Sequence, residues 1–502
     1  MIFKAELWGV LCCLSLTGCA LPLADFTPYA DQAAELRQDL AQNKASAAEA
    51  TLQGEIKSDP ELYALELGRI EQLSGDYQDS IKNYNVVINT FNAKATAPKI
   101  QIKKMFKGSK ADNDSAYRPQ PYEKVLAFQY QGINYLAEGK PGDALVDFRQ
   151  AETLEAHLNA HVLPKIQKKP VIPQTPAGAP SYADLLAQTR NQTTLSNSLS
   201  NGVADFIAGL AFLNAGDLNS ASLSMQNAEM RLPVALFQEE ALLAMQKSGM
   251  TPDMIAAKQK ASGAPSSLPK LKKANGTSPV FVMTEQGFVP ILQQQIRTVP
   301  IPGTSYQADF IVPYYPITPL SVDAYSLVID NATPSIQGEM HLSVADLAAV
   351  SLLERYPFIV NDASFTTNRT INNIVRDVAA VQYAQNAVDN PPLQLPGQSD
   401  KDYQNELDNA EDDLADAQLS LTLDLLILST PHTTDVNIRS WSTLPEDIHI
   451  QKLELLPGNH ALVLQDNQKN TIVTCTFTSQ QGNNALIWIN TQLPTPVCQQ
   501  LL

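Results

Sequence analysis

Cysteine and basic residues are scarce in this chain. It has 5 cysteines among 502 residues, and 35 lysines and arginines against 52 aspartates and glutamates, which gives a formal net charge of −17. Binding to phosphates requires a positive electrostatic field, so this balance excludes nucleic acid as a partner of the chain as a whole. The length predicts about two to four domains in a soluble, acidic body.

The motifs of common catalytic sites are also missing. The sequence has no phosphate-binding P-loop, no G-x-G-x-x-G turn, no H-E-x-x-H zinc helix and no G-x-S-x-G nucleophile elbow. His157 and His161 could share one side of a helix and hold a metal, but they have no evident third ligand, so a solvated face is the favoured interpretation. We therefore predict no catalytic residue, no metal site and no cofactor.

No apolar run beyond the N-terminal segment reaches the ~20 residues that a transmembrane helix requires. The strongest candidate is "LSLTLDLLIL", residues 419–428, which Asp424 interrupts. The N-terminal segment "MIFKAELWGVLCCLSLTGCA" combines one lysine, an apolar run from Leu7 to Leu16 and small residues. This pattern is typical of a secretory leader, which would take two of the five cysteines with it when it is cleaved.

The end of this leader indicates a lipid attachment site. Leu16, Thr17, Gly18 and Cys19 resemble the bacterial lipobox, in which the thiol becomes linked to a diacylglycerol and the leader is cut before the cysteine. The alternative is a chance cysteine in an apolar leader. Several acyl chains on one cysteine would make membrane residence effectively permanent. In the Gram-negative lipoproteins that this segment resembles, an aspartate after the cysteine retains the protein in the inner membrane; Ala20 stands there, which implies the outer membrane.

Three segments of the first half share one spacing of glycine, aromatic and alanine positions, which predicts a repeat array. They are "LYALELGRIEQLSGDYQDSIKNYNVV", "AFQYQGINYLAEGKPGDALVDFRQA" and "VADFIAGLAFLNAGDLNSASLSMQNAEMRLP". Small residues let two helices approach closely, and the aromatic residue one turn on fills the gap between them. The residues that we predict to pack in this way are Gly68, Gly132, Gly209, Ala144 and Ala221.

Each segment also has a second glycine seven residues after the first, where the chain would turn, and an aspartate near the start of the next helix. Each unit is therefore expected to be a helix hairpin, and the three segments resemble tetratricopeptide repeats. Stacked hairpins form a superhelix whose concave face commonly binds a peptide or protein segment. The alternative is a purely structural spacer, because a fold does not by itself imply a function.

The second half mixes strands and helices. "PVFVMTEQGFVPILQQQIRTVPIP" and "ADFIVPYYPITPL" are typical of short strands, whereas "VADLAAVSLLERYPFIV" and "RTINNIVRDVAAVQYAQNAV" have helical apolar spacing. The C-terminal segments "NHALVL", "NTIVTCTF" and "NALIWIN" indicate further strands. Cys475 lies in one of them and Cys498 in the tail, so the two are candidates for a disulfide, the alternative being two separate thiols.

The sequence therefore predicts a multidomain protein with an N-terminal α-helical, tetratricopeptide-like superhelix, an α+β module and a small C-terminal β-rich domain. The predicted segments are a lipoprotein signal peptide at 1–18, a tether at 19–30, the repeat domain at 31–245, a linker at 246–277, the α+β module at 278–430 and the β-rich domain at 431–502.

Several stretches resemble a poorly characterised family of Gram-negative tetratricopeptide-repeat outer-membrane lipoproteins. They are "YRPQPYEKVLAFQYQGINYLAEG", "ALVDFRQAE", "VFVMTEQGFVP" with the later "VPIP", and "NIRSWSTLPEDIHIQKLELLPGNHALVL". The family has no established catalytic residues. Arg439, Ser440, Trp441, Leu444 and Pro445 match its "RSW-LP" stretch, which is expected to shape a turn against the C-terminal sheet or to present a binding surface.

Together these features predict an outer-membrane lipoprotein with its body in the periplasm. It would act as a protein-protein interaction scaffold through its repeats, in cell-envelope assembly or peptidoglycan synthesis. Its expected partners are envelope proteins and, through the covalent lipid, the membrane. The alternative is a cell-wall or polysaccharide-binding protein, or an envelope enzyme, acting through the C-terminal module.

Overall fold

The structure, a computed structural model, describes most of the chain from Tyr29 to Leu502. The described residues are 29–52, 59–96, 117, 119–158, 160, 201–262, 276–300, 307–316, 325–391, 394, 398–429 and 439–502. The predicted signal peptide and lipidation site, and all but the end of the predicted tether, lie outside them.

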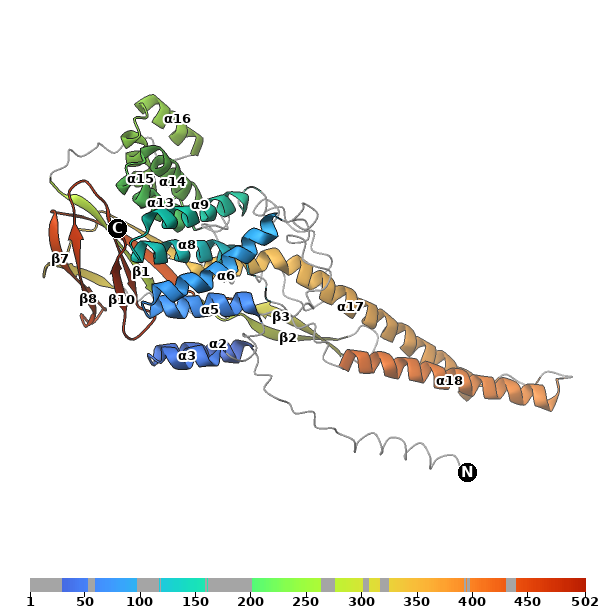
Figure 1. Ribbon diagram of the computed structural model, residues 1–502. Coiled ribbons are helices and arrows are strands. Elements are labelled where there is room, and N and C mark those ends of the chain that lie inside the picture. The colour runs from blue at the N-terminus through green and yellow to red at the C-terminus, as the bar shows by residue number, and fades with distance from the viewer. Residues whose placement is uncertain are drawn as a thin grey trace.

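Helices make up the described part of the first half, as the sequence predicts (Figure 1). They are α2 (Tyr29–Ala41), α3 (Ala45–Thr51), α5 (Pro60–Leu73), α6 (Tyr77–Thr96), α8 (Pro121–Ala137), α9 (Pro141–His157), α13 (Val203–Asn214), α14 (Leu218–Arg231), α15 (Ala235–Lys247) and α16 (Pro252–Ser262). The pairs α5–α6, α8–α9 and α13–α14 pack as hairpins. Gly75, Gly139 and Gly216 turn the chain within them at φ of 82°, 69° and 76°, a conformation that glycine adopts without steric cost.

The segment between the two halves differs from the prediction. Residues 246–277 were expected to form a linker because they are rich in Ala, Ser, Lys, Gly and Pro. The structure instead continues α15 to Lys247 and forms α16 from Pro252. Ile255 of α16 is buried, and this apolar contact favours a helix over residues 252–262; residues 263–275 of the predicted linker lie outside the described residues.

The described strands of the second half form three sheets. They are β1 (Ser278–Gln286), β2 (Gln293–Pro300), β3 (Gln307–Tyr314), β4 (Ser326–Ile329), β5 (Gly338–Ser343), β6 (Asp447–Leu455), β7 (Gly458–Gln465), β8 (Thr471–Ser479), β9 (Ala485–Asn490) and β10 (Val497–Gln500). One sheet has the order β10-β9-β1-β6-β5, a second has the order β4-β7-β8, and β2 and β3 form a hairpin.

The five-stranded sheet crosses the predicted boundary between residues 430 and 431. Strand β1 pairs antiparallel with β6 and parallel with β9, so a strand assigned to the α+β module lies between two strands of the predicted C-terminal domain. A boundary there does not separate two sheets. Both flanking strands lie more than 160 residues further along the chain, and alternation of apolar residues carries no information on such pairing.

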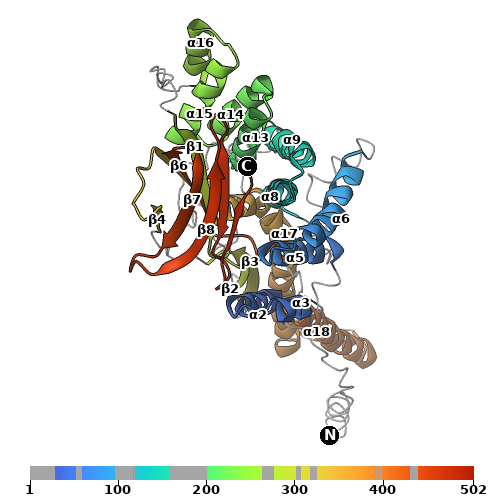
Figure 2. The same cartoon turned by 60° about the vertical axis from the view of Figure 1, so that its left-hand side comes forward.

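Helices, the five-stranded sheet and the three-stranded sheet form three successive layers (Figure 2). Successive residues of β1 point to opposite faces of its sheet. Phe281 and Met283 belong to the core shared with the repeat helices, whereas Val280 and Val282 belong to the core shared with the three-stranded sheet. The helical half and the sheet half are therefore joined through one continuous hydrophobic core.

A long helical hairpin, here called the arm, projects from this body (Figure 1). It consists of α17 (Val344–Asp389) and α18 (Asp400–Ser429). Ser343 caps α17 by accepting a hydrogen bond from the backbone N–H of Asp346. The 46 residues of α17 give a helix about 70 Å long. Within the described residues, no helix is both long and apolar enough to cross a membrane.

Candidate functional site

Small residues set the distance between the paired helices of each hairpin. A Cβ atom at Gly132 would lie 2.5 Å from Cε1 of Phe148, and one at Gly209 would lie 2.8 Å from Cε of Met225. The corresponding distance from Gly68 to Cε1 of Tyr84 is 3.3 Å. Ala144 and Ala221, the other predicted packing residues, are fully buried. The predicted small residues thus lie where the partner helix comes closest.

The helical array also packs around a segment from the far end of the chain. Residues 439–446, here called the docked segment, are bound by the carboxylate of Glu66 on α5. Glu66 Oε1 accepts a hydrogen bond of 2.6 Å from the backbone N–H of Ser442. Its Oε2 accepts bonds from the backbone N–H and the hydroxyl of Thr443, at 3.1 and 2.6 Å. One helix carboxylate therefore satisfies three donors of the docked segment.

Trp441 anchors the docked segment between two repeat hairpins. Its indole is fully buried, and its ring contacts the rings of Tyr84 on α6 and Tyr130 on α8 edge-on, with centroids 5.8 and 5.9 Å away. Its backbone N–H donates to Glu123 Oε1 at 2.7 Å. Burial of a tryptophan among aromatic rings contributes a large apolar area, so this residue helps to hold the segment against the helices.

The start of the docked segment is held by further polar contacts. Arg439 forms an ion pair with Asp59, and the Tyr29 hydroxyl donates to the backbone carbonyl of Ser440. Arg37 donates from Nε to the carbonyl of Ser442 at 2.9 Å. The "RSW-LP" stretch therefore lies against the helices, inside the protein, where the Ser440 carbonyl and the Trp441 N–H are already hydrogen-bonded.

A second buried polar contact joins the helices to the sheet. Arg69 of α5 pairs with Glu285 of β1, and both side chains are fully buried. The guanidinium also donates to Gln492 Oε1 at 2.6 Å and lies 4.2 Å from the centroid of the Tyr130 ring. A buried ion pair is favourable only when its remaining hydrogen-bonding groups are satisfied, and these contacts supply part of that requirement.

Burial shifts the pKa values of the carboxyls that hold the docked segment. Desolvation raises the pKa of Glu66, although the donors of Thr443 and Ser442 oppose the shift. It raises the pKa of Glu123 to about 7, against the opposing effect of hydrogen bonds from Trp441 and Gln120. Burial is therefore the main cause of the raised pKa values of Glu66 and Glu123, and the hydrogen-bond donors reduce the size of the shift.

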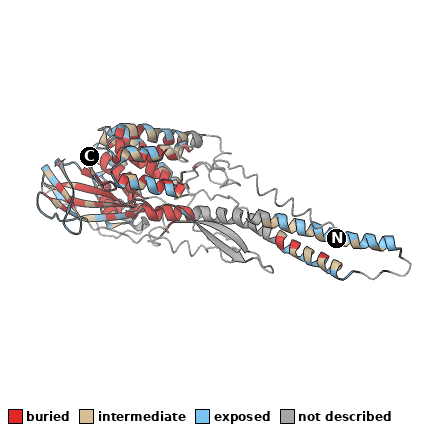
Figure 3. Cartoon of the chain, turned by 90° about the horizontal axis from the view of Figure 1, so that it is seen from below, coloured by how far each residue is buried: buried red, intermediate tan, exposed pale blue. Residues whose placement is uncertain are grey.

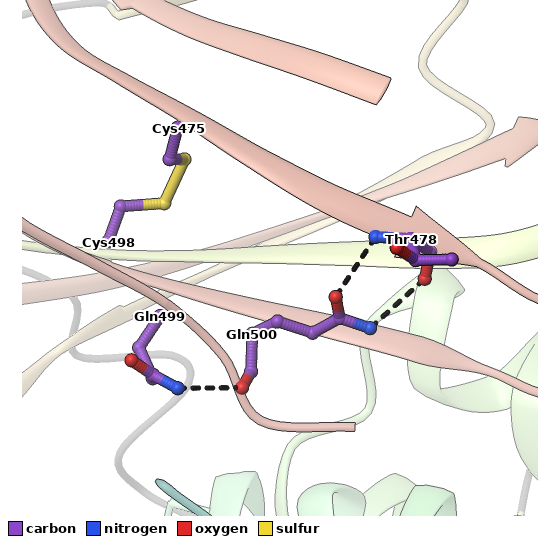
Figure 4. Close-up of a disulfide and its surroundings, with 5 residues drawn as sticks. All are labelled: Cys475, Thr478, Cys498, Gln499 and Gln500. Carbon is purple, nitrogen blue, oxygen red and sulfur yellow. Dashed lines mark hydrogen bonds between the residues drawn. A yellow bond between two sulfur atoms is a disulfide. The ribbon is translucent and has the colours of Figure 1, made fainter. Parts of the chain in front are cut away.

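The disulfide candidates are bonded to each other. Cys475 of β8 and Cys498 of β10 form a disulfide that links the three-stranded sheet to the edge of the five-stranded sheet (Figure 4). Nearby, the Gln500 side chain accepts from the Thr478 N–H and donates to the Thr478 carbonyl, both at 3.0 Å. Gln500 thus makes the two bonds that a neighbouring strand would make with the edge of β8.

The arm is built as a two-helix seam with a polar interruption. Buried or half-buried residues recur at the heptad spacing expected of such a seam, namely Ile374, Asp377, Val381, Ala384 and Val388 on α17, and Tyr403, Leu407, Ala410, Leu414, Ala417, Leu421 and Asp424 on α18. Asp377 accepts a hydrogen bond of 2.8 Å from the Ser420 hydroxyl. Burial and the neighbouring Asp377 raise the pKa of Asp424.

Two groups of residues from the sequence analysis lie wholly or partly outside the described part of the chain. Leu16, Thr17, Gly18 and Cys19 lie outside the described residues. His157 ends α9, and His161 also lies outside the described part of the chain. Among the described residues no group of three or more His, Cys, Asp or Glu side chains could hold a metal ion.

Sequence reasoning missed Glu66, Arg69, Glu123 and Glu285. The available signal was the position of charged residues within apolar helix and strand stretches such as "LYALELGRIEQL" and "VFVMTEQ", where a charge has to be buried with a partner. No known protein family, curated protein or solved structure matches the chain.

Proposed function

We propose that the chain is a periplasmic lipoprotein, anchored to the outer membrane through Cys19, that acts as a protein-protein interaction scaffold in cell-envelope assembly or peptidoglycan synthesis. The lipobox-like segment before Ala20 supports the anchor. The spacing of Gly68, Gly132 and Gly209, and the close helix contacts at these glycines, support a tetratricopeptide-like superhelix as its framework.

The arm is the observation that carries this proposal. The docked segment covers the helix surface formed by Glu66, Tyr84, Glu123 and Tyr130, so this surface is not free to bind a partner peptide. The arm extends away from the body in both views of its length (Figures 1 and 3). Tyr383 on it is 80% exposed. We therefore assign partner binding to the arm.

Site-specific photo-crosslinking of the full-length chain in the cell tests the scaffold role. One photoreactive residue replaces Tyr383 on the arm, and another replaces Met254 on α16, which is 53% exposed. We expect a reproducible envelope-protein adduct from the arm position that the body position does not give. Identical adduct patterns from the two positions would indicate nonspecific neighbours and would contradict the proposal.

Acyl labelling tests the anchor separately. The unaltered chain should incorporate radiolabelled palmitate and fractionate with the outer membrane, whereas Cys19→Ser should do neither, because the thiol is the attachment atom. Equal labelling of the two proteins would contradict lipidation at Cys19.

A further inference from the structure

The apolar run of α18 is only partly covered. Residues 419–428 contain seven leucines and isoleucines in ten positions, more than a single helix-helix seam can bury. Leu421 lies in the seam with α17, but Leu419 is 58% exposed and Leu423 is 50% exposed. A helix that is apolar on several sides is normally covered on several sides, and among the described residues no element covers Leu419 and Leu423 on this outer face.

The exposed leucines continue a line of exposed carboxylates. One face of α18 carries four of these residues at successive spacings of four, three and four, namely Asp412, Asp416, Leu419 and Leu423. Ala417, Leu421 and Asp424 of α18 line the seam, so this face points away from α17. In Figure 3 the helix that returns from the tip of the arm, α18, is coloured mostly as exposed. The face thus has an apolar half nearer the body and an acidic half nearer the tip.

Charge decides which kind of partner fits this face. Helix α18 has nine aspartates and glutamates among its 30 residues and one lysine. A second copy would bring the same negative charges opposite one another, and an anionic lipid surface would repel them too. A segment with lysines or arginines opposite Asp412 and Asp416, and apolar residues opposite Leu419 and Leu423, has the complementary pattern.

We propose that the outer face of α18 docks a basic amphipathic helix of a partner protein. The partner helix packs its apolar side on Leu419 and Leu423, and its cations pair with Asp412 and Asp416, which turns the arm into a three-helix bundle. This inference rests on the scaffold role proposed above and assigns the partner's chemistry to one face of the arm.

The test measures binding of a synthetic probe by the full-length lipoprotein in detergent. The probe is a peptide of about 28 residues with leucine at heptad positions a and d and lysine at e and g. A control peptide has glutamate in place of every lysine. We expect the lysine peptide alone to bind, and Leu419→Asp with Leu423→Asp to weaken its binding about tenfold or more. The matched control Leu456→Asp, whose side chain is 64% exposed on the body, should leave binding unchanged.

Crosslinking in the cell supplies the second measurement. A photoreactive residue at Leu423 should give an adduct whose mapped peptide is a basic amphipathic sequence. Equal binding of the lysine peptide by the Leu419→Asp, Leu423→Asp variant would overturn the proposal. An adduct at Leu423 that maps to a second copy of the chain would also overturn it. The same holds if the protein floats with anionic vesicles and the Leu419→Asp, Leu423→Asp variant does not. If the lysine peptide does not bind but a photoreactive residue at Tyr383 still gives its envelope-protein adduct, this inference is wrong and the scaffold role remains supported.

Discussion

Arg69 and Glu285, which are 216 residues apart, form an ion pair in which both side chains are fully buried between the repeat helices and the five-stranded sheet. The pair fixes α5 against β1, and Gln492 of the chain's last segment shares the same guanidinium. Because the two charges are removed from water together, each depends on the other for its stability in the core.

Removal of one partner of this pair should be strongly destabilising. We expect Arg69→Met to lower the free energy of unfolding by about 3–5 kcal/mol, because the carboxylate of Glu285 is left buried without its counter-charge. Urea unfolding followed by circular dichroism measures the change. Lys82→Ala, which breaks the exposed pair with Asp79, is the control and should leave the midpoint unchanged. A midpoint for Arg69→Met equal to that of the control would refute the expected dependence.

Gly132 and Gly68 should differ in their tolerance of a methyl group. Gly132→Ala places Cβ 2.5 Å from the Phe148 ring, so we expect a net loss of about 1–3 kcal/mol. In Gly68→Ala the new Cβ lies 3.3 Å from Cε1 of Tyr84. The higher helix propensity of alanine, worth about 1 kcal/mol, should offset this tighter contact. Thermal unfolding of both variants checks the order, and equal melting temperatures would show that these contacts do not limit the helix spacing.

Glu123 should make stability depend on pH. Its pKa of about 7 in the folded chain exceeds the ordinary value of a glutamate, so the folded state binds more protons than the unfolded state between the two values. The contribution of this carboxyl to stability is therefore present at low pH and is lost as the pH rises towards 7. Glu123→Gln should reduce the fall in the urea midpoint across this range. Part of this pH dependence will remain in the variant, because the pKa values of Glu71 and Asp147 are also about 7.

Direct titration separates Glu123 from the other carboxyls. A carbon-13 NMR signal that disappears in Glu123→Gln should titrate with a midpoint near 7. A midpoint in the range of an exposed glutamate would contradict the role of burial at this site.

Reduction of the disulfide should weaken the connection between the three-stranded and five-stranded sheets before the helices unfold. The cysteines are 23 residues apart, so the chain-entropy account gives a loss of about 3 kcal/mol on reduction or on Cys498→Ser. Thermal unfolding with and without reductant measures this change. Unaltered melting in the presence of reductant, with free thiols verified by alkylation, would show that Gln500 and the core suffice to join the sheets.

The parts of this fold that the sequence predicts are those with local causes. Gly68 and Tyr84, or Gly132 and Phe148, lie within one hairpin, so their spacing along the chain already encodes the contact. The bond between Cys475 and Cys498 was a candidate because few cysteines remain once the predicted leader is removed. Even the exposed leucines of α18 were visible as an apolar run that Asp424 interrupts.

The contacts that the sequence did not predict are long-range and polar. Pairing of β1 with β6 and β9 joins strands whose alternation patterns fit many partners equally well. Glu66 and Arg69 look like ordinary charged helix residues until their partners Thr443 and Glu285 are placed beside them. The "RSW-LP" stretch was expected to shape a turn or present a surface, and its contacts with the repeat helices follow only from the three-dimensional arrangement.

The docked segment has a consequence for the order in which the chain can fold. Glu66, Arg69 and Glu123 are synthesised early, but their partners Glu285, Trp441 and Thr443 emerge much later. A chain that folds from its N-terminus must keep these side chains hydrated until the last residues arrive, because burying them alone is unfavourable. Completion of the helical half is thus deferred to the end of synthesis. A product truncated before residue 439 should stay unfinished and remain a substrate for proteases.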